Sequence, residues 1–126
     1  MKLVPVEPDG RLYDAIERVR KKAGGSPAWY VIQQIHRGNA GAFLFDEVET
    51  YMVVERLVTD VVTMHVWIIS GSPGATHLAE MVSLVDDLAR RLGANTWKME
   101  SPRKGWARAL RDYVKPVRVV YERILK

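Results

Sequence analysis

The spacing of apolar residues changes along the chain, and this change limits the folds that the sequence can adopt. Before residue 41 apolar side chains recur every three or four residues, as on one face of an α-helix. From residue 41 they follow the period of about two that is typical of β-strands, and after residue 74 the helical spacing returns. This order predicts a mixed α/β (α+β) sheet with helices on both faces.

The N-terminal part is predicted to contain a weak strand and two helices. The strand covers Leu3 to Val6, the first helix Asp9 to Ala23, and the second Ala28 to His36. The pair Ser26-Pro27 is typical of a helix start, with serine as the N-cap and proline at the first helical position.

Three strands are predicted next, at Ala42–Phe45, Thr50–Val58 and Val61–Ile69. The breaks between them are short, so the strands should form an antiparallel meander. The third strand is apolar on both faces and should therefore lie centrally, covered above and below. Strict alternation assigns its residues to two faces: Val62, Met64, Val66 and Ile68 to one, and Val61, Thr63, His65, Trp67 and Ile69 to the other.

The remaining elements predict a crossover connection. The longest helix covers Ala75 to Leu92, with Gly93 suited to end it, and a short strand covers Thr96 to Glu100. A strand that follows such a helix should lie parallel to the strand before it. A short helix from Ser101-Pro102 to Asp112 and a last strand at Val117–Leu125 complete the order.

Size and composition restrict the class of protein. With 126 residues the chain is of ordinary size for one domain, so we expect residues 1–126 to fold as a single domain. No apolar run is long enough for a membrane span or a signal peptide, which predicts a soluble protein with no membrane partner. The sequence has no cysteine, which excludes disulfides, thiol nucleophiles and thiolate metal sites.

The positive charge lies at the C-terminus. The formal net charge is +4, yet residues 103 to 126 contain 8 basic and 2 acidic residues, a net of +6, which leaves −2 for the rest. Basic residues of the segment 103–118 alternate with Trp106 and Tyr113, a combination that can contact phosphates and stack on bases of a nucleic acid. The same pattern also arises when a short helix turns its basic face to solvent. The basic residues are Arg103, Lys104, Arg108, Arg111, Lys115 and Arg118.

The order of elements resembles that of the GNAT acetyltransferases. The segment Ser101 to Leu110 (SPRKGWARAL), followed by Tyr113 and by Val119-Val120-Tyr121, is similar to the C-terminal motif of small GNAT-like proteins encoded by tailed phages and prophages. The resemblance implies a GNAT-like fold. In that fold the helix after the central strand holds the pyrophosphate of acetyl-CoA at its N-terminus, where amide groups are free donors.

The loop that would bind acetyl-CoA matches the family signature in part. The candidate cofactor-binding residues are Ser70, Gly71, Ser72, Gly74 and Ala75. Of the signature (Q/R)-x-x-G-x-(G/A), only the central glycine is present, at Gly74, and Pro73 removes one amide donor. The alternative is structural: Ser72 caps the helix, Pro73 takes its first position and Gly71 turns the chain.

Catalytic residues are not identified by the sequence. The family's tyrosine acid is displaced here to Tyr113, which favours a packing role in the core. His65 is the most suitable base, although a histidine within a buried strand is more often a hydrogen-bonded core residue; Glu49, Glu55 and Asp60 are the nearby carboxylates. The three histidines, His36, His65 and His77, fall on separate elements, so no metal site is predicted.

Two functions follow from the resemblance. The preferred one is a non-catalytic phage GNAT-like protein, located in the virion or host cytoplasm, that binds a phage or host protein or forms a homo-oligomer through an exposed sheet edge. The alternative is an acetyl-CoA-dependent N-acetyltransferase with a degenerate pyrophosphate loop. Catalysis would be excluded if Trp67 or Trp97 filled the gap between the strands that end at Ile69 and begin at Thr96.

Overall fold

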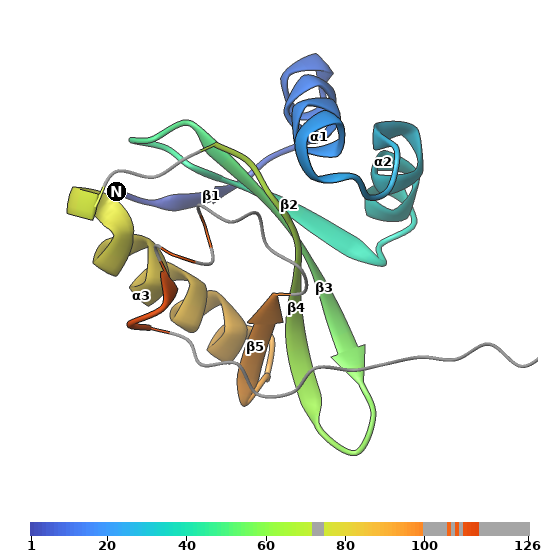
Figure 1. Ribbon diagram of the computed structural model, residues 1–126. Helices are drawn as coiled ribbons and strands as arrows, with labels where there is room; N and C mark the ends of the chain where they lie inside the picture. Colours follow the sequence, from blue (N-terminus) through green and yellow to red (C-terminus); the bar gives the residue numbers. More distant parts are fainter. Residues whose placement is uncertain (72–74, 100–105, 107, 109, 114–126) are drawn as a thin grey trace, which may run out of the picture.

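A five-stranded sheet forms the centre of the protein in the computed structural model, which describes residues 1–71, 75–99, 106, 108 and 110–113 (Figure 1). The strands lie in the order β1-β2-β3-β4-β5. Their bounds are β1 Leu3–Pro5, β2 Ala40–Phe45, β3 Thr50–Val58, β4 Val62–Ile69 and β5 Thr96–Met99. The first four strands pair antiparallel and β5 pairs parallel to β4, so the predicted meander and crossover are confirmed.

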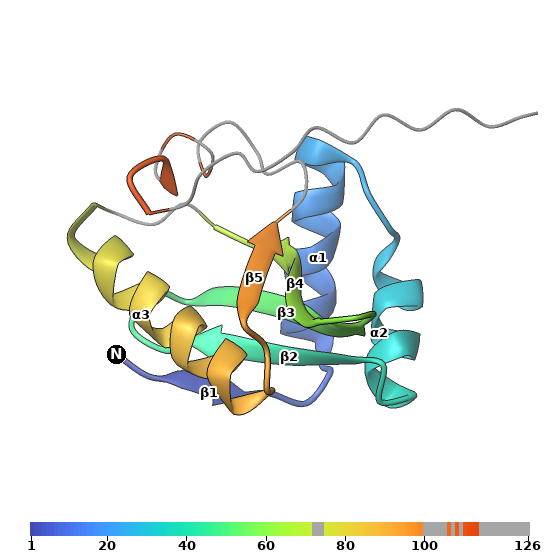
Figure 2. The same cartoon turned by 90° about the horizontal axis from the view of Figure 1, so that it is seen from below.

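Helices cover both faces of this sheet. Helices α1 (Gly10–Ala23) and α2 (Ala28–His36) lie on one face and α3 (Ala75–Arg91) on the other (Figures 1 and 2). The predicted strand at 117–125 and the start of the predicted helix at 101–105 lie outside the described residues. None of the described helices has the length and apolar character needed to cross a lipid bilayer.

Two hydrophobic cores hold the layers together. The α3-side core lies between the sheet and α3. Its buried members are Phe45, Met52, Val54, Met64, Val66, Leu78, Met81, Val85, Leu88, Ala89, Ala94, Trp106 and Leu110. The α1-side core, against α1 and α2, is smaller; its buried members are Leu12, Ile16, Ala28, Val31, Ala42 and Val53. As expected for a strand apolar on both faces, β4 contributes to both cores.

Local sequence explains most of the helix ends. The Asp9 carboxylate accepts a hydrogen bond of 2.9 Å from the amide of Leu12 and caps α1. Gly93 has a φ of 76° and ends α3: its amide donates to the carbonyl of Arg90, and the next amide donates to the carbonyl of Ala89. This pair of bonds is the Schellman motif that a glycine at this position favours.

The predicted cap of α2 is wrong. Pro27, with φ −68° and ψ 151°, occupies the N-cap position, and no side chain caps the helix. The ring of proline fixes φ but leaves ψ free to be extended, so Pro27 is the cap rather than the first helical residue, while the helix begins at Ala28 as predicted. The Pro27 carbonyl accepts hydrogen bonds from the amides of Tyr30 and Val31.

A β-bulge interrupts β4 near its C-terminal end. Val54 of β3 pairs with Val66, whereas the preceding residue, Val53, pairs with Ile68. Trp67 is therefore an extra residue with no partner in the register of β3, as at a bulge.

The bulge changes which residues of β4 share a face. Alternation placed Ile68 with Val66 and Ile69 with Trp67, and this prediction is wrong. Ile68 packs with Trp67 in the α1-side core, while Ile69 packs with Val66 in the α3-side core. The extra residue shifts the side-chain period by one position beyond the bulge.

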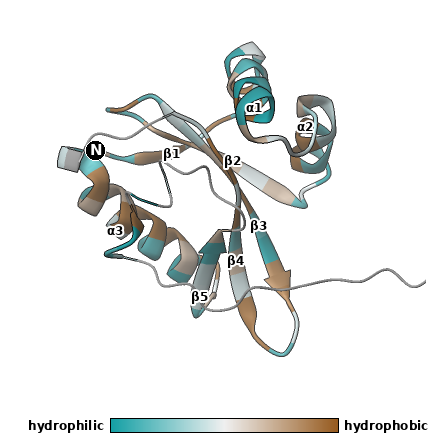
Figure 3. Cartoon of the chain, viewed as in Figure 1, coloured by the Kyte–Doolittle hydropathy of each residue, from teal (hydrophilic) through white to brown (hydrophobic). Residues whose placement is uncertain are grey.

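The hairpin between β3 and β4 projects beyond the other strands, as Figure 1 shows. In Figure 3 hydrophobic colour marks both strands beside the turn of this hairpin, and Val58 and Val61, on either side of the turn, are exposed. The apolar surface at this end is therefore not buried by the rest of the described chain.

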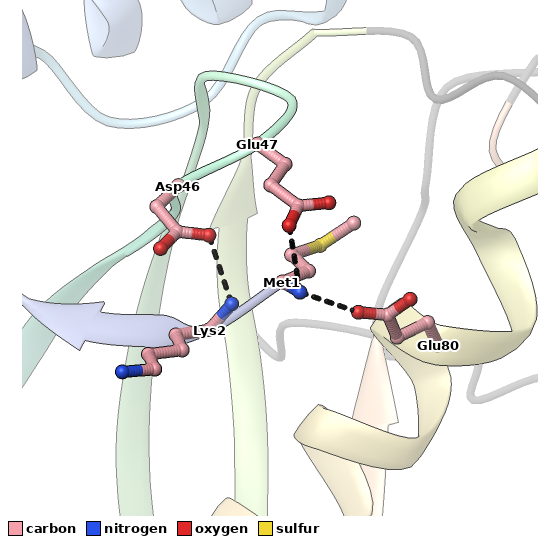
Figure 4. A network of polar contacts seen from close by, with 5 residues as sticks. All are labelled: Met1, Lys2, Asp46, Glu47 and Glu80. Atoms are coloured by element: carbon pink, nitrogen blue, oxygen red, sulfur yellow. Dashed lines mark hydrogen bonds and ion pairs between the residues drawn. The ribbon is translucent and has the colours of Figure 1, made fainter.

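The N-terminal amino group joins three parts of the fold (Figure 4). The Met1 ammonium lies 2.8 Å from a carboxylate oxygen of Glu80, on α3, and 2.9 Å from one of Glu47, in the β2–β3 turn. The adjacent amide of Lys2 donates to the carboxylate of Asp46. Hydrogen bonds to Glu80 and Glu47 raise the pKa of this amino group from 8.0 to about 10.

We expect this contact to stabilise the protein at neutral pH and to lose its effect in alkaline solution. Because folding raises the pKa of the amino group, its contribution is complete below pH 8.0 and disappears as the pH rises through about 10. The double variant Glu47→Gln/Glu80→Gln should thus have a lower melting temperature than the wild type at pH 7, and the difference should vanish above pH 10. Glu49→Gln, in the same turn, is the control; a difference that is constant with pH would contradict the assignment.

Candidate functional site

An open cleft of about 300 Å³ lies beside the C-terminal end of β4. One side is formed by the last turns of α1 and the loop to α2, and the other by the bulged part of β4 with Met99 and Trp106. The described residues that line it are Ile16, Val19, Arg20, Ala23, Gly24, Gly25, Ser26, Val66, Trp67, Ile68, Ile69, Met99 and Trp106.

The cleft lies where the described pairing between β4 and β5 ends. The parallel pairing between β4 and β5 begins at Thr63 with Thr96 and ends at Val66 with Met99. Beyond Val66, β4 continues to Ile69 beside β3 alone within the described part of the chain. Among the described residues, the bulge therefore lies in the cleft just beyond the last pair of β4 and β5.

Neither tryptophan of the two strands closes this gap. Trp67 lines the cleft and directs its ring edge-on toward Tyr30 of α2, with ring centres 6.1 Å apart. Trp97 packs against the α3-side core, and its indole nitrogen donates a hydrogen bond of 2.7 Å to Asp86 of α3. The steric condition that would have excluded catalysis is not met.

The loop after β4 is tied to the sheet and to the wall of the cleft. Ser70 is buried; its hydroxyl accepts from the amide of Tyr51, and its own amide donates to the Tyr51 carbonyl, both at 2.9 Å. Gly71 has a φ of 75°, and its carbonyl accepts a hydrogen bond of 3.0 Å from the indole of Trp106. Ser70 thus extends the β3–β4 ladder by one residue, and Gly71 turns the chain.

The other candidate cofactor-binding residues fall in two groups. Ala75 is the first residue of α3, whose first turn contains no acidic side chain. Ser72 and Gly74, together with Pro73, lie outside the described residues. The assignment of these residues to a cofactor remains a prediction.

A histidine–glutamate pair lies on the sheet face covered by α1 and α2. Nδ1 of His65, on β4, is 2.9 Å from a carboxylate oxygen of Glu55, on β3, and the two side chains are 13% and 29% exposed. His65 precedes Trp67 by two residues on the same face, and Lys98 of β5 is its partner in register. His65 is therefore a hydrogen-bonded histidine, as sequence favoured, in a position that leaves one ring nitrogen for another partner. The remaining candidate carboxylates, Glu49 and Asp60, are exposed in turns.

The predicted core position of Tyr113 is wrong. This tyrosine is 48% exposed and lies in a turn, where its amide donates to the carbonyl of Leu110. Trp106 and Leu110 are the residues of this segment that enter the α3-side core. The turn after Leu110 directs the following side chains outward, so Tyr113 is absent from the described lining of the cleft.

The histidines and the basic segment do not form a site within the described residues. His36, His65 and His77 lie on α2, β4 and α3, and the described chain holds no cluster of side chains suited to a metal ion. Of the basic residues predicted to contact nucleic acid, Arg108 and Arg111 are exposed. Arg103, Lys104, Lys115 and Arg118 lie outside the described residues, and nucleic-acid binding stays a prediction.

Comparison with known proteins identifies the fold. No protein-family model matches the sequence, and no curated protein matches it. Among solved structures, the chain is similar to the ribosomal-protein-alanine N-acetyltransferase of Brucella melitensis biovar Abortus 2308, with a TM-score of 0.70, 12% identity and coverage of 99% of this chain and 97% of that one. A probable acetyltransferase gives a TM-score of 0.68 at 10% identity, covering 100% and 97% of the two chains. An acetyltransferase of Trypanosoma brucei gives 0.60 at 11%, covering 98% and 99%. The protein has a GNAT-like fold.

We expect an alanine at position 71 to be more destabilising than the backbone angle alone requires. A Cβ on Gly71 would lie 3.0 Å from the hydroxyl of the buried Thr50, whereas a Cβ on Gly38, which has a similar φ of 78°, meets nothing within 4 Å. Gly38→Ala should therefore lower the free energy of unfolding by about 1 kcal/mol, the cost of the backbone conformation. Gly71→Ala should lower it by about 2 to 3 kcal/mol, because strain and crowding add. Equal losses in urea unfolding would show that Thr50 does not restrict the loop.

Proposed function

We propose that this protein transfers an acetyl group from acetyl-CoA to a primary amine. The observation that carries the proposal is the open cleft at the bulge of β4, which is lined by Trp67 and its neighbours on the strand. The GNAT-like fold supports the same chemistry, because the similar solved structures include acetyltransferases. Fold alone does not determine function, so the residues of the cleft have to supply the argument.

The bulge offers a backbone group that can form a hydrogen bond with the carbonyl oxygen of the thioester. The extra residue of a bulge is left out of the ladder, so the backbone at Trp67 can hydrogen-bond a ligand in the cleft. An amide aimed at the carbonyl oxygen would stabilise the negative charge that develops when an amine attacks the thioester. In this step the carbon–nitrogen bond forms, the carbon–sulfur bond breaks, and the thiolate leaves.

His65 is the proposed base. A primary amine is mostly protonated at neutral pH and has to lose a proton before it can attack. Glu55 holds Nδ1 of His65 at 2.9 Å, which orients the ring and leaves Nε2 to accept that proton. His65 is two residues from Trp67 on the same strand face, a separation of roughly 7 Å along a strand, within reach of an acceptor seated in the cleft.

The phosphates of the cofactor are assigned to the start of α3. The amides at a helix N-terminus attract phosphate, and the first turn of α3 has no acidic side chain to oppose it. Gly71, Ser72, Gly74 and Ala75 are the proposed cofactor-binding residues. Ser70, whose hydroxyl is used by Tyr51, is assigned to positioning the loop rather than to a phosphate.

A non-catalytic role is the second candidate. In this interpretation the protein is a phage GNAT-like component that binds a virion or host protein. The favouring observation is the exposure of large apolar side chains: Trp29 on α2 is 62% exposed, and Val58 and Val61 at the β3–β4 hairpin are 61% and 54% exposed. Side chains of this kind are often covered by a partner protein.

Thiol release tests the proposed reaction directly. The chain has no cysteine, so a thiol-reactive dye reports only the coenzyme A set free when acetyl-CoA is incubated with short peptides that carry free α-amino groups. We expect peptide-dependent release, and we expect His65→Gln to reduce kcat by about 100-fold or more without changing the affinity for coenzyme A in calorimetry. His36→Gln, on the exposed end of α2, is the matched control and should behave like the wild type.

The same experiments can reject the proposal. If calorimetry detects no heat with acetyl-CoA or coenzyme A at millimolar concentration, the non-catalytic role is favoured. If thiol release persists unchanged in His65→Gln, the cleft is catalytic but the assignment of the base is wrong.

A further inference from the structure

A second, smaller cavity shares part of its lining with the cleft and is lined by residues of the α3-side core. Its volume is about 20 Å³, and apolar side chains from the sheet, from α3 and from the segment around Trp106 surround it. The described residues that line it are Phe45, Met52, Val66, Ile69, Leu78, Met81, Val82, Val85, Trp97, Met99, Trp106 and Leu110.

Four residues line both the cleft and this cavity, and they form a partition between the two. They are Val66 and Ile69 of β4, Met99 at the end of β5, and Trp106. The bulge lies between Val66 and Ile69 and directs both of these side chains toward the α3-side core. The partition therefore lies beside the part of β4 to which the thioester carbonyl is assigned.

The partition has a rigid side and an adaptable side. Trp106 is 3% exposed, and its indole donates to the carbonyl of Gly71, so its ring has a fixed position. Met99 is half-buried and is the last residue of β5. Methionine is unbranched and has three rotatable bonds, which allows it to repack around a ligand more easily than a β-branched residue can.

We infer that the small cavity is a subsite for the hydrocarbon end of an acyl group longer than acetyl, so that the donors are short straight-chain acyl-CoA thioesters. This inference rests on the proposed acyl transfer. A cavity of about 20 Å³ holds one water-sized or methyl-sized group, and a site lined by apolar side chains is expected to be dry. An acetyl group bound at the bulge would leave it empty, whereas a chain with one more carbon would fill it.

The transfer itself is unchanged by the longer chain. The amine nitrogen forms a bond to the acyl carbon, the bond to sulfur breaks, and the departing thiolate of coenzyme A takes up the proton that the amine loses. The added methylene groups only move from water into an apolar cavity, which contributes to binding of the donor.

Calorimetric titration with coenzyme A and its acetyl, propionyl, butyryl and octanoyl thioesters tests the inference on the intact chain. We expect propionyl-CoA to bind up to about fourfold tighter than acetyl-CoA, the gain for burial of one methylene group. Butyryl-CoA should bind no tighter than propionyl-CoA, because the cavity holds one methyl-sized group. Octanoyl-CoA should lose the gain because its chain exceeds the cavity.

A cavity-filling variant tests whether the tighter binding of propionyl-CoA arises in the small cavity. Val82 of α3 lines the small cavity and is absent from the described lining of the cleft, so Val82→Leu should fill the subsite and abolish the preference for propionyl-CoA. Its affinity for acetyl-CoA and coenzyme A should stay that of the wild type. Val54→Ile adds a methylene group in the same core at a residue lining neither cavity, and it should keep the preference.

The outcomes separate this inference from the function on which it rests. If acetyl-CoA binds and propionyl-CoA binds no tighter, the subsite is wrong while acetyl transfer stands. If the preference exists but survives in Val82→Leu, the chain binds elsewhere and the subsite is again wrong. If no thioester binds, both the proposed function and the subsite fail.

Discussion

The bulge at Trp67 is the feature on which the rest of the site depends. One extra residue in β4 ends the regular alternation, turns Ile68 toward α1 and Ile69 toward α3, and follows the last described pair of β4 with β5. The cleft and the partition therefore both lie at a single irregularity in the ladder.

Hydrogen bonds fix the chain beyond the bulge and at the crossover. Next to it, Ser70 resumes the pairing with Tyr51, and Trp106 binds the carbonyl of Gly71, so the strand is fixed again just beyond the irregularity. At the other end of the crossover, Arg56 of β3 donates to the carbonyl of Leu92, after α3. These bonds join the sheet, the loop and the crossover, and they fix the strand on which the cleft lies.

Sequence predicted the elements well and the site poorly, for physical reasons. The bounds of α2 and β3 were predicted without error because the apolar period, glycines and turn residues that define them are local. The bulge was missed because β4 is apolar on both faces there, so alternation carries no information about which side each residue takes. Tyr113 was misplaced because the direction of a turn after Leu110 is not encoded by spacing. The α1–α2 loop of the cleft was missed as well, although Gly24 and Gly25, both with positive φ, marked a sharp change of direction between two helices.

An amide-resolved titration is the most direct test of the central claim that a coenzyme A thioester binds at the bulge. In nuclear magnetic resonance spectra of ¹⁵N-labelled protein, acetyl-CoA should shift the amide signals of Trp67 and Ile68 together with those of Gly24 and Gly25 across the cleft. The signals of Val58 and Val61, at the far hairpin, should not move. Shifts confined to that hairpin or to the exposed Arg108 and Arg111, with none at the bulge, would contradict the account.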